Sequence, residues 1–187
     1  MHRRKLDAWL TAYLASHPDE EAVVTRFRQF MMNHERCFAR DCWAGHITGS
    51  AWVVDPGQTA VLLTHHRKLN IWVQLGGHSD GDPNTARVAR KEAEEESGLE
   101  VDFATREIFD LDVHEIPARH DAPAHEHYDV RFAFVAKQKT YVVSAESNDL
   151  QWVQIEDLEA FTQEESILRM GRKWRAHQGK VSGVDRR

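Results

Sequence analysis

The chain has 187 residues and a formal net charge of −6, with 41% hydrophobic and 29% charged residues. This length and balance predict one globular domain with an appendage and exclude a disordered or fibrous chain. The acidic charge disfavours binding to a nucleic acid polymer, which needs a concentrated positive surface. No apolar run approaches the roughly 18 residues of a membrane span, so we expect no membrane association.

The two cysteines, Cys37 and Cys42, have a spacing that matches no zinc or redox motif. We therefore expect two reduced thiols, which predicts a cytoplasmic protein.

Residues 1–40 are predicted to form an extension of two helices. Apolar residues recur at helical spacing in both segments, and Pro18 suits the first turn of the second helix. The apolar stripes contain Leu6, Trp9, Leu10, Tyr13 and Leu14, then Val23, Val24, Phe27, Phe30 and Met31. We expect these stripes to pack against the main domain or against a second subunit, which leaves a homodimer open.

The main domain is expected over residues 41–175. Residues 50–54 and 60–64 predict a β-hairpin, because both runs are rich in β-forming residues and Asp55-Pro56-Gly57-Gln58 between them favours a turn. Residues 71–75 predict a strand that ends at Gly76-Gly77, followed by a loop over residues 78–82.

A helix is predicted next, with Asp82 as its cap, Pro83 in its first turn and Gly98 at its exit. Residues 108–113, 127–136 and 150–155 predict further strands, and residues 158–174 a C-terminal helix. We expect residues 176–187 to be a frayed tail, because they are polar and basic.

Three carboxylates, Glu92, Glu95 and Glu96, fall within one sector of roughly 100° on the predicted helix, and small alanines occupy the neighbouring sector. The alanines permit close approach to a sheet. The carboxylates repel one another unless a cation or solvent relieves the repulsion. Oxygen ligands favour Mg²⁺ or Mn²⁺, whereas the alternative is a solvated acidic face.

The whole segment from Gly77 to Leu99 resembles the Nudix box of the Nudix hydrolase superfamily, a loop–helix–loop signature. The matching residues are Gly77, Glu92, Ala93, Glu95, Glu96, Gly98 and Leu99. The sequence departs from the family pattern at two positions. Pro83 stands where the family has Glu, and Lys91 stands where it has Arg. We expect Asp82 or Asp80 to pair with Lys91 instead.

The resemblance implies an α/β (α+β) fold, an α/β/α sandwich around a mixed β-sheet, with the N-terminal helices outside it. It also implies an enzyme that uses Mg²⁺, with Mn²⁺ as an alternative, to hydrolyse a phosphoanhydride (pyrophosphate) bond. The expected substrate is a small nucleotide-like molecule such as a nucleoside diphosphate linked to another moiety. Glu92, Glu95 and Glu96, with a backbone carbonyl near Gly76, are implied to hold the metal and to carry catalysis.

Two other functions stay open for this scaffold. One is a non-catalytic nucleotide-binding or sensing module, which would be expected to lose metal carboxylates, whereas all three are present here. The other is an isomerase, which typically recruits a cysteine in the cleft, whereas both cysteines here precede the predicted core strands.

The strand after the helix has an alternating pattern that places His125, His127, Asp129 and Arg131 on one face. This face is predicted either to line the cleft and contact substrate, or to be solvent-exposed or a buried hydrogen-bonded network. A zinc pair at His125 and His127 is a weaker hypothesis, since no third and fourth ligands are evident in the sequence.

Two further segments are candidates for substrate contact. His78 follows Gly76-Gly77 and is expected to point toward the metal site or to be an ordinary loop histidine. Arg67, beside Lys68, is predicted to attract phosphates, and a solvated hairpin tip explains these charges equally well.

Overall fold

The computed structural model describes residues 2–67, 70–119, 122–143 and 147–184. Its strands form one mixed sheet around β1 (Gly45–Val54) and β7 (His125–Ala136), which run parallel along their whole length. The other strands are β2 (Ala60–His66), β3 (Trp72–Val73), β4 (Leu75–His78), β5 (Val101–Phe103), β6 (Asp110–Ile116) and β8 (Ser147–Gln154).

The two central strands organise the remaining ones by antiparallel pairing. β1 pairs with β4 along its middle, from Thr48 to Ala51, and with β2 at its end, and β2 in turn pairs with β3 and β8. On the other side, β7 pairs with β6 and then with β5. The middle of β1 therefore lies between β4 and β7, and the start of β7 between β1 and β6.

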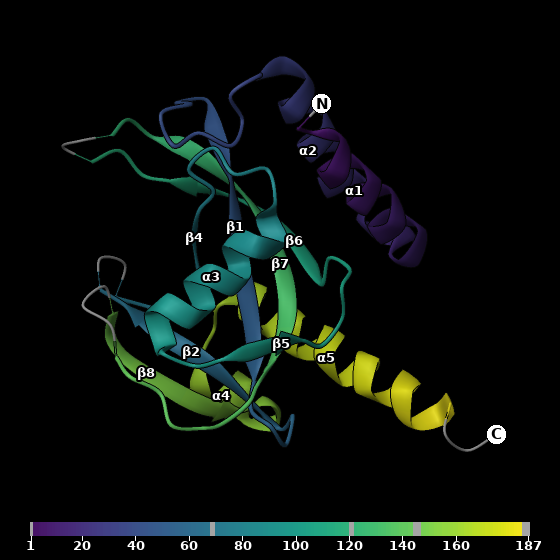
Figure 1. Ribbon diagram of the computed structural model, residues 1–187, viewed down its shortest axis with the longest axis vertical. Helices are drawn as coiled ribbons and strands as arrows, with labels where there is room; N and C mark the ends of the chain where they lie inside the picture. The colour runs from purple at the N-terminus through teal and green to yellow at the C-terminus, as the bar shows by residue number, and fades with distance from the viewer. Residues whose placement is uncertain (1, 68–69, 120–121, 144–146, 185–187) are drawn as a thin grey trace.

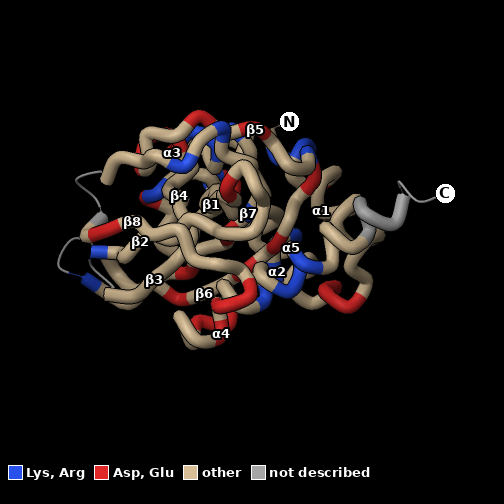
Figure 2. The backbone as a smooth tube through the Cα atoms, turned by 90° about the horizontal axis from the view of Figure 1, so that it is seen from below, with Lys and Arg blue, Asp and Glu red and all other residues tan. Residues whose placement is uncertain are grey.

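Helices cover both faces of the sheet. The helices are α1 (Arg4–Ser16), α2 (Glu21–Asn33), α3 (Thr85–Ser97), α4 (Leu158–Phe161) and α5 (Glu165–Val184), with short 3-10 turns at Pro18–Glu20 and Ile155–Asp157. Figure 1 shows α3 lying across the sheet, and Figure 2 shows α3 and α4 on opposite sides of the strands. This arrangement confirms the predicted sandwich around a mixed sheet.

The alternation of side chains along β1 explains the two layers. Ile47, Ala51 and Val53 join the core shared with α1, α2 and α3. Trp52 and Val54 point the other way, into the core shared with α4 and α5. Each face buries its own set of apolar residues because successive side chains of a strand point to opposite sides.

The apolar stripes of α1 and α2 pack within the chain, against β7. Trp9 makes an edge contact with Phe132, and Phe30 stacks on Tyr128 with ring centroids 4.0 Å apart. Of the two predicted partners for these stripes, the main domain is thus the one that the structure shows. None of the helices in the described ranges combines the length and apolar character that a membrane crossing requires.

Several element boundaries differ from the predicted ones. The predicted strand 71–75 is two strands, and the second, β4, continues through Gly76 and Gly77 to His78. The C-terminal helix is interrupted after Phe161, and its second part, α5, continues to Val184. Residues 185–187 of the predicted tail lie outside the described residues. β5 was not predicted, because three residues are too few to show a period.

Candidate active site

Helix α3 begins and ends close to where its sequence predicts. Thr85 is its first residue, and Asp82 accepts a hydrogen bond from the backbone N–H of Asn84 at 2.9 Å, just before the helix rather than as its cap. Gly98 ends the helix with a left-handed φ of 67°, as the sequence predicts. These ends fix which turns of the helix face β4.

Helix α3 lies unusually close to β1. At Gly49 a Cβ atom would lie 2.6 Å from the carbonyl oxygen of Thr85 and 3.1 Å from the backbone nitrogen of Ala89. A side chain at this position would push the helix away, so glycine on the strand and alanine on the helix together allow the approach. The approach brings the carboxylates of α3 against strand β4.

Glu96 is held by the backbone of β4. The N–H of Gly76 donates a hydrogen bond to Oε1 of Glu96 at 3.0 Å. Gly76 itself has φ of 155°, and a Cβ there would lie 2.7 Å from Cα of Ser50 on β1. Only glycine fits between the two strands in this conformation.

Glu92 packs against the next glycine. A Cβ on Gly77 would lie 2.7 Å from Cδ of Glu92, and the side chain of Glu92 is only 18% exposed. Glu95 is 60% exposed and therefore faces solvent. The carboxylates thus run from the buried edge of β4 out to the surface.

The prediction that Asp82 or Asp80 pairs with Lys91 was wrong. Asp82 pairs with Arg87 at 2.7 Å and Asp80 pairs with Arg40 at 2.6 Å. Lys91 instead lies 3.0 Å from Glu95 and 3.4 Å from Glu92, and the hydrogen bond with Glu95 and the charge of Glu92 raise the pKa of Lys91. Both acids of the loop before α3 are thus paired with arginines, and Lys91 pairs with the glutamates of its own helix instead.

This set of donors fits a magnesium ion. The candidate ligands are carboxylate oxygens on adjacent turns of one helix, and hard oxygen ligands are what Mg²⁺ prefers. The ammonium group of Lys91 already relieves part of their mutual repulsion. A divalent cation would relieve it more completely, because it carries twice the charge of the ammonium group.

Histidine side chains form a row across strands β4, β1, β7 and β6. Register places His46 on β1 opposite His127 on β7, and His127 opposite His114 on β6. On the other side of β1, His78 on β4 is opposite Thr48. The ring of His46 lies 4.7 Å from that of His127 and 5.0 Å from that of His78, between ring centroids.

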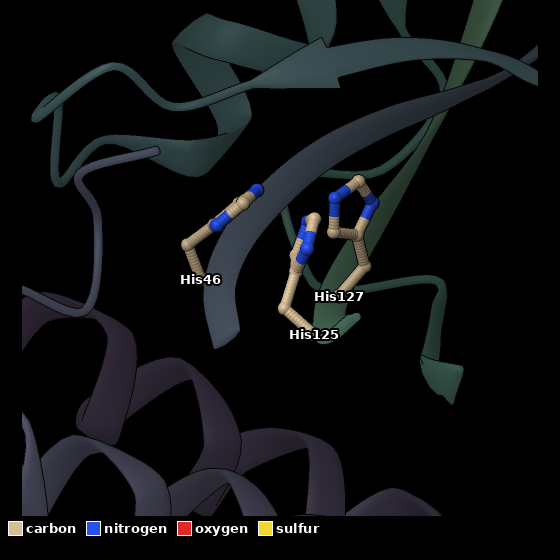
Figure 3. A group of neighbouring side chains, drawn as sticks. All are labelled: His46, His125 and His127. Carbon is tan, nitrogen blue, oxygen red and sulfur yellow. The ribbon is translucent and has the colours of Figure 1, made fainter. Parts of the chain in front are cut away.

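Three of the histidines, His46, His125 and His127, point toward one another from β1 and β7 (Figure 3). Burial lowers the pKa of His46 to about 4, and the neighbouring His78 and His125 add to the effect. Burial likewise lowers the pKa of His127 to about 2, with the nearby rings contributing. These two imidazoles are therefore neutral at physiological pH.

Arg131 occupies the centre of a buried charge network further along β7. Its guanidinium is 2% exposed and lies within 3.0 Å of carboxylate oxygens of Asp110, Asp112 and Asp129. Asp129 also accepts hydrogen bonds from Thr48 and Ser50. For Asp129 and Arg131, the structure shows a buried hydrogen-bonded network, one of the alternatives predicted for this face.

The structure brings together some of the predicted substrate contacts. His78, His125 and His127 gather at one end of the sheet, and His78 belongs to strand β4 rather than to a loop. Arg67 is exposed in the turn after β2, and Lys68 beside it lies outside the described residues.

His46 was not predicted as a site residue. The alternation of His46, Thr48 and Ser50 with Ile47 and Ala51 is the pattern that would have indicated it, since it places these polar residues on one face.

A mixed sheet covered by helices on both faces, with a carboxylate-bearing helix packed against a glycine pair, defines the class of protein as an α/β sandwich of the Nudix type. The family model described as NUDIX domain matches residues 46–173. The chain belongs to this family. A comparison with curated proteins found no match.

Solved structures of Nudix proteins are similar to this chain. A NUDIX family hydrolase from Clostridium perfringens has a TM-score of 0.55 and 24% identity over 70% of this chain and 97% of its own. An Ap4A hydrolase from C. elegans has a TM-score of 0.52 and 14% identity, covering 72% of this chain and 98% of its own. The dihydroneopterin triphosphate pyrophosphohydrolase of E. coli has a TM-score of 0.52 and 14% identity, covering 68% of this chain and 92% of its own. At these identities the likeness concerns the fold.

Proposed function

We propose that the protein is a Mg²⁺-dependent hydrolase that cleaves a phosphoanhydride bond in a nucleoside diphosphate linked to another moiety or in a related nucleotide. The observation that carries this proposal is the placement of the family's three helix carboxylates. Glu96 is hydrogen-bonded to Gly76 and Glu92 is packed on Gly77, so both are held against the glycine pair that precedes the helix in the family signature.

Glu92, Glu95 and Glu96, with a backbone carbonyl near Gly76, would hold the ion. Bound Mg²⁺ supplies charge neutralisation for the diphosphate and acidifies the attacking water. The protein contributes by keeping the carboxylates in place before substrate arrives. Two of them need little rearrangement, since β4 already fixes Glu96 and confines Glu92.

Glu95 has a different role in this proposal. It faces solvent and pairs with the ammonium group of Lys91, an exposed contact of the kind that contributes little to stability. When Lys91 is displaced, the carboxylate of Glu95 can complete the cation site or accept a proton from water.

The substrate is proposed to lie over the end of the sheet that carries the histidines. His78, His125 and His127 are adjacent to the glycine pair through β4 and β1, and Arg67 is the proposed contact for a more distant phosphate. The similar E. coli protein is a dihydroneopterin triphosphate pyrophosphohydrolase, which supports a phosphate chain as the recognised group.

A binding module without catalysis is less well supported. Such a module has no need for three carboxylates arranged against a glycine pair, and all three are present here. Both functions include nucleotide binding, so a measurement of cleavage is what distinguishes them.

The proposal is tested by incubating the full chain with a panel of phosphoanhydrides in Mg²⁺ or Mn²⁺ and identifying products by mass. The panel contains nucleoside triphosphates, dinucleoside polyphosphates, nucleotide sugars and ADP-ribose. We expect at least one compound to be cleaved between two phosphorus atoms, only when metal is added. Tight binding of a compound that is never cleaved would identify a sensing module instead.

A further inference from the structure

Three imidazole rings, separate from the carboxylates of α3, converge at the start of β1 and β7. His46, His125 and His127 each offer a ring nitrogen, and these nitrogens lie within 4.8 Å of one another. In a tetrahedral zinc site, with Zn–N bonds of about 2.0–2.1 Å, ligand nitrogens are roughly 3.4 Å apart. Small side-chain rotations would therefore bring the three nitrogens onto one ion.

The burial of these nitrogens is costly unless something pairs with them. His46 is 2% exposed, and neither of its ring nitrogens makes a hydrogen bond of good geometry within the structure. Nε2 of His127 is buried and without a hydrogen-bond partner as well. An unpaired buried polar group is destabilising, so the cluster favours an occupant that accepts lone pairs.

His125 is oriented as metal-binding histidines usually are. Its Nδ1 lies 2.8 Å from the carbonyl oxygen of Pro123. Because a carbonyl only accepts, Nδ1 carries the proton and the lone pair is on Nε2. A hydrogen bond of this kind fixes the tautomer of histidine ligands in metal sites.

The chemistry of the three donors selects the class of ion. All are imidazole nitrogens, which suit zinc and similar transition metals, whereas Mg²⁺ requires oxygen ligands. Ligation needs a ring nitrogen with a free lone pair, and the converging nitrogens of His46, His125 and His127 can supply one each. A water molecule is the competing occupant, and metal titration distinguishes it from an ion.

We propose that His46, His125 and His127 form a binding site for a divalent transition metal ion of the zinc type, distinct from the carboxylate site on α3. Three protein ligands leave a coordination position open, as in zinc sites that bind water or a substrate oxygen. His78 lies beside the cluster, with its ring centroid 5.0 Å from that of His46. Strand β4 therefore connects the two sites, through Gly76 and Gly77 to one and through His78 to the other.

The test is a titration of the full chain, free of any histidine tag, with Co²⁺ at neutral pH in excess Mg²⁺. Co²⁺ replaces zinc and shows visible absorption that reports nitrogen ligation and low coordination number, while Mg²⁺ occupies oxygen sites. We expect one Co²⁺ per chain with this absorption, displaced by Zn²⁺. His125→Ala and His127→Ala should each weaken binding by roughly 100-fold or more, since even loss of an orienting partner costs about 10–100-fold.

The control variants separate this site from the others. His177→Ala removes a histidine of α5 that stacks on Trp174, outside the cluster, and should bind Co²⁺ like the wild type. A triple variant with Glu92, Glu95 and Glu96 changed to Gln should also retain the Co²⁺ spectrum. Because His46 is fully buried, the two β7 variants carry the test, with circular dichroism to verify that they are folded.

Three results would overturn the proposal. The first is a wild-type protein that binds neither Co²⁺ nor Zn²⁺, which would leave water as the occupant. The second is unchanged Co²⁺ affinity in folded His125→Ala and His127→Ala. The third is binding that disappears in the triple glutamine variant while the histidine variants retain it. None of these readouts depends on hydrolysis, so the proposed function stands or fails separately.

Discussion

The backbone N–H of Gly76 on β4 donates a hydrogen bond of 3.0 Å to Oε1 of Glu96 on α3. This bond joins the two halves of the candidate site, the glycine pair of the strand and the carboxylates of the helix. A backbone donor cannot change rotamer, so it fixes the position of the carboxylate more firmly than another side chain would. Glu96 is therefore the carboxylate whose alteration should affect catalysis most directly.

We expect Glu96→Gln to lower kcat by about two to three orders of magnitude, because one charged ligand of the cation is lost while the side chain keeps its shape. The amide oxygen can still accept the bond from Gly76, so the thermal unfolding midpoint should change little. Steady-state kinetics with saturating Mg²⁺ measure the effect. Glu94→Gln on the same helix, which removes an exposed pair with Arg90, is the matched control and should keep wild-type turnover. Equal kcat in the two variants would contradict the assignment.

The glycine pair allows activity and stability to be separated. The three atoms nearest to a methyl group at Gly77 all belong to the side chain of Glu92, a flexible group that can move aside, so Gly77→Ala should lower kcat at least tenfold with little loss of stability. At Gly76 the methyl meets the backbone of Ser50, and φ is 155°, so Gly76→Ala should destabilise the fold itself. Urea denaturation and kinetics of both variants check this contrast. Equal changes in kcat and in stability in the two variants would show that Glu92 is not confined by Gly77.

The carboxylate site could be predicted because its residues are close in sequence. Glu92, Glu95 and Glu96 lie on one helix, and their spacing alone places them on one side of it. The pairing of Lys91 was predicted wrongly, since it depends on the loop before the helix. In that loop Asp80 has a positive φ of 49°, a conformation that the sequence does not reveal.

The histidine cluster could be predicted only in part, because it depends on the register of distant strands. His125 and His127 share a face by simple alternation, and both were identified from the sequence. That His46 lies opposite His127 follows from the parallel pairing of β1 with β7, and that pairing is a property of the whole fold. His46 therefore supplies the third ligand that the zinc hypothesis lacked. It could not be recognised in the sequence, because its spacing from His125 and His127 matches no metal-ligand pattern.

The N-terminal helices should unfold together with the sheet. Phe27 of α2 is fully buried against Tyr128 of β7, with ring centroids 5.3 Å apart. Phe27→Ala should lower the free energy of unfolding by about 3–5 kcal/mol, because it leaves a cavity between helix and sheet. Met32→Ala on the same helix is the control, since Met32 is 80% exposed. Urea transitions followed by circular dichroism and by tryptophan fluorescence should shift together. A separate early transition of the helices would show that the extension is an independent unit.

Asp110 should make the stability of the protein depend on pH. Burial raises the pKa of this carboxyl, but the hydrogen bond from Arg169 and the charges of Arg131 and Lys173 outweigh burial, so the pKa lies below its usual value. An acid whose pKa falls on folding binds fewer protons in the folded state. Its contribution to stability is therefore complete above the pKa of the unfolded chain, near 4, and is lost as the pH falls through the lower folded value.

Replacing this carboxylate tests both the size and the pH range of the effect. Asp110→Asn removes one of the carboxylates that compensate the buried guanidinium of Arg131, so the free energy of unfolding should fall by about 3–5 kcal/mol at neutral pH. The gap to the wild type should narrow below about pH 4, because protonated Asp110 and asparagine are both uncharged. Glu100→Gln, which removes an exposed pair with Lys137, should change stability little at any pH. Urea titrations across the acid range measure all three proteins, and a gap that stays constant with pH would show that Asp110 is not ionised in the folded state.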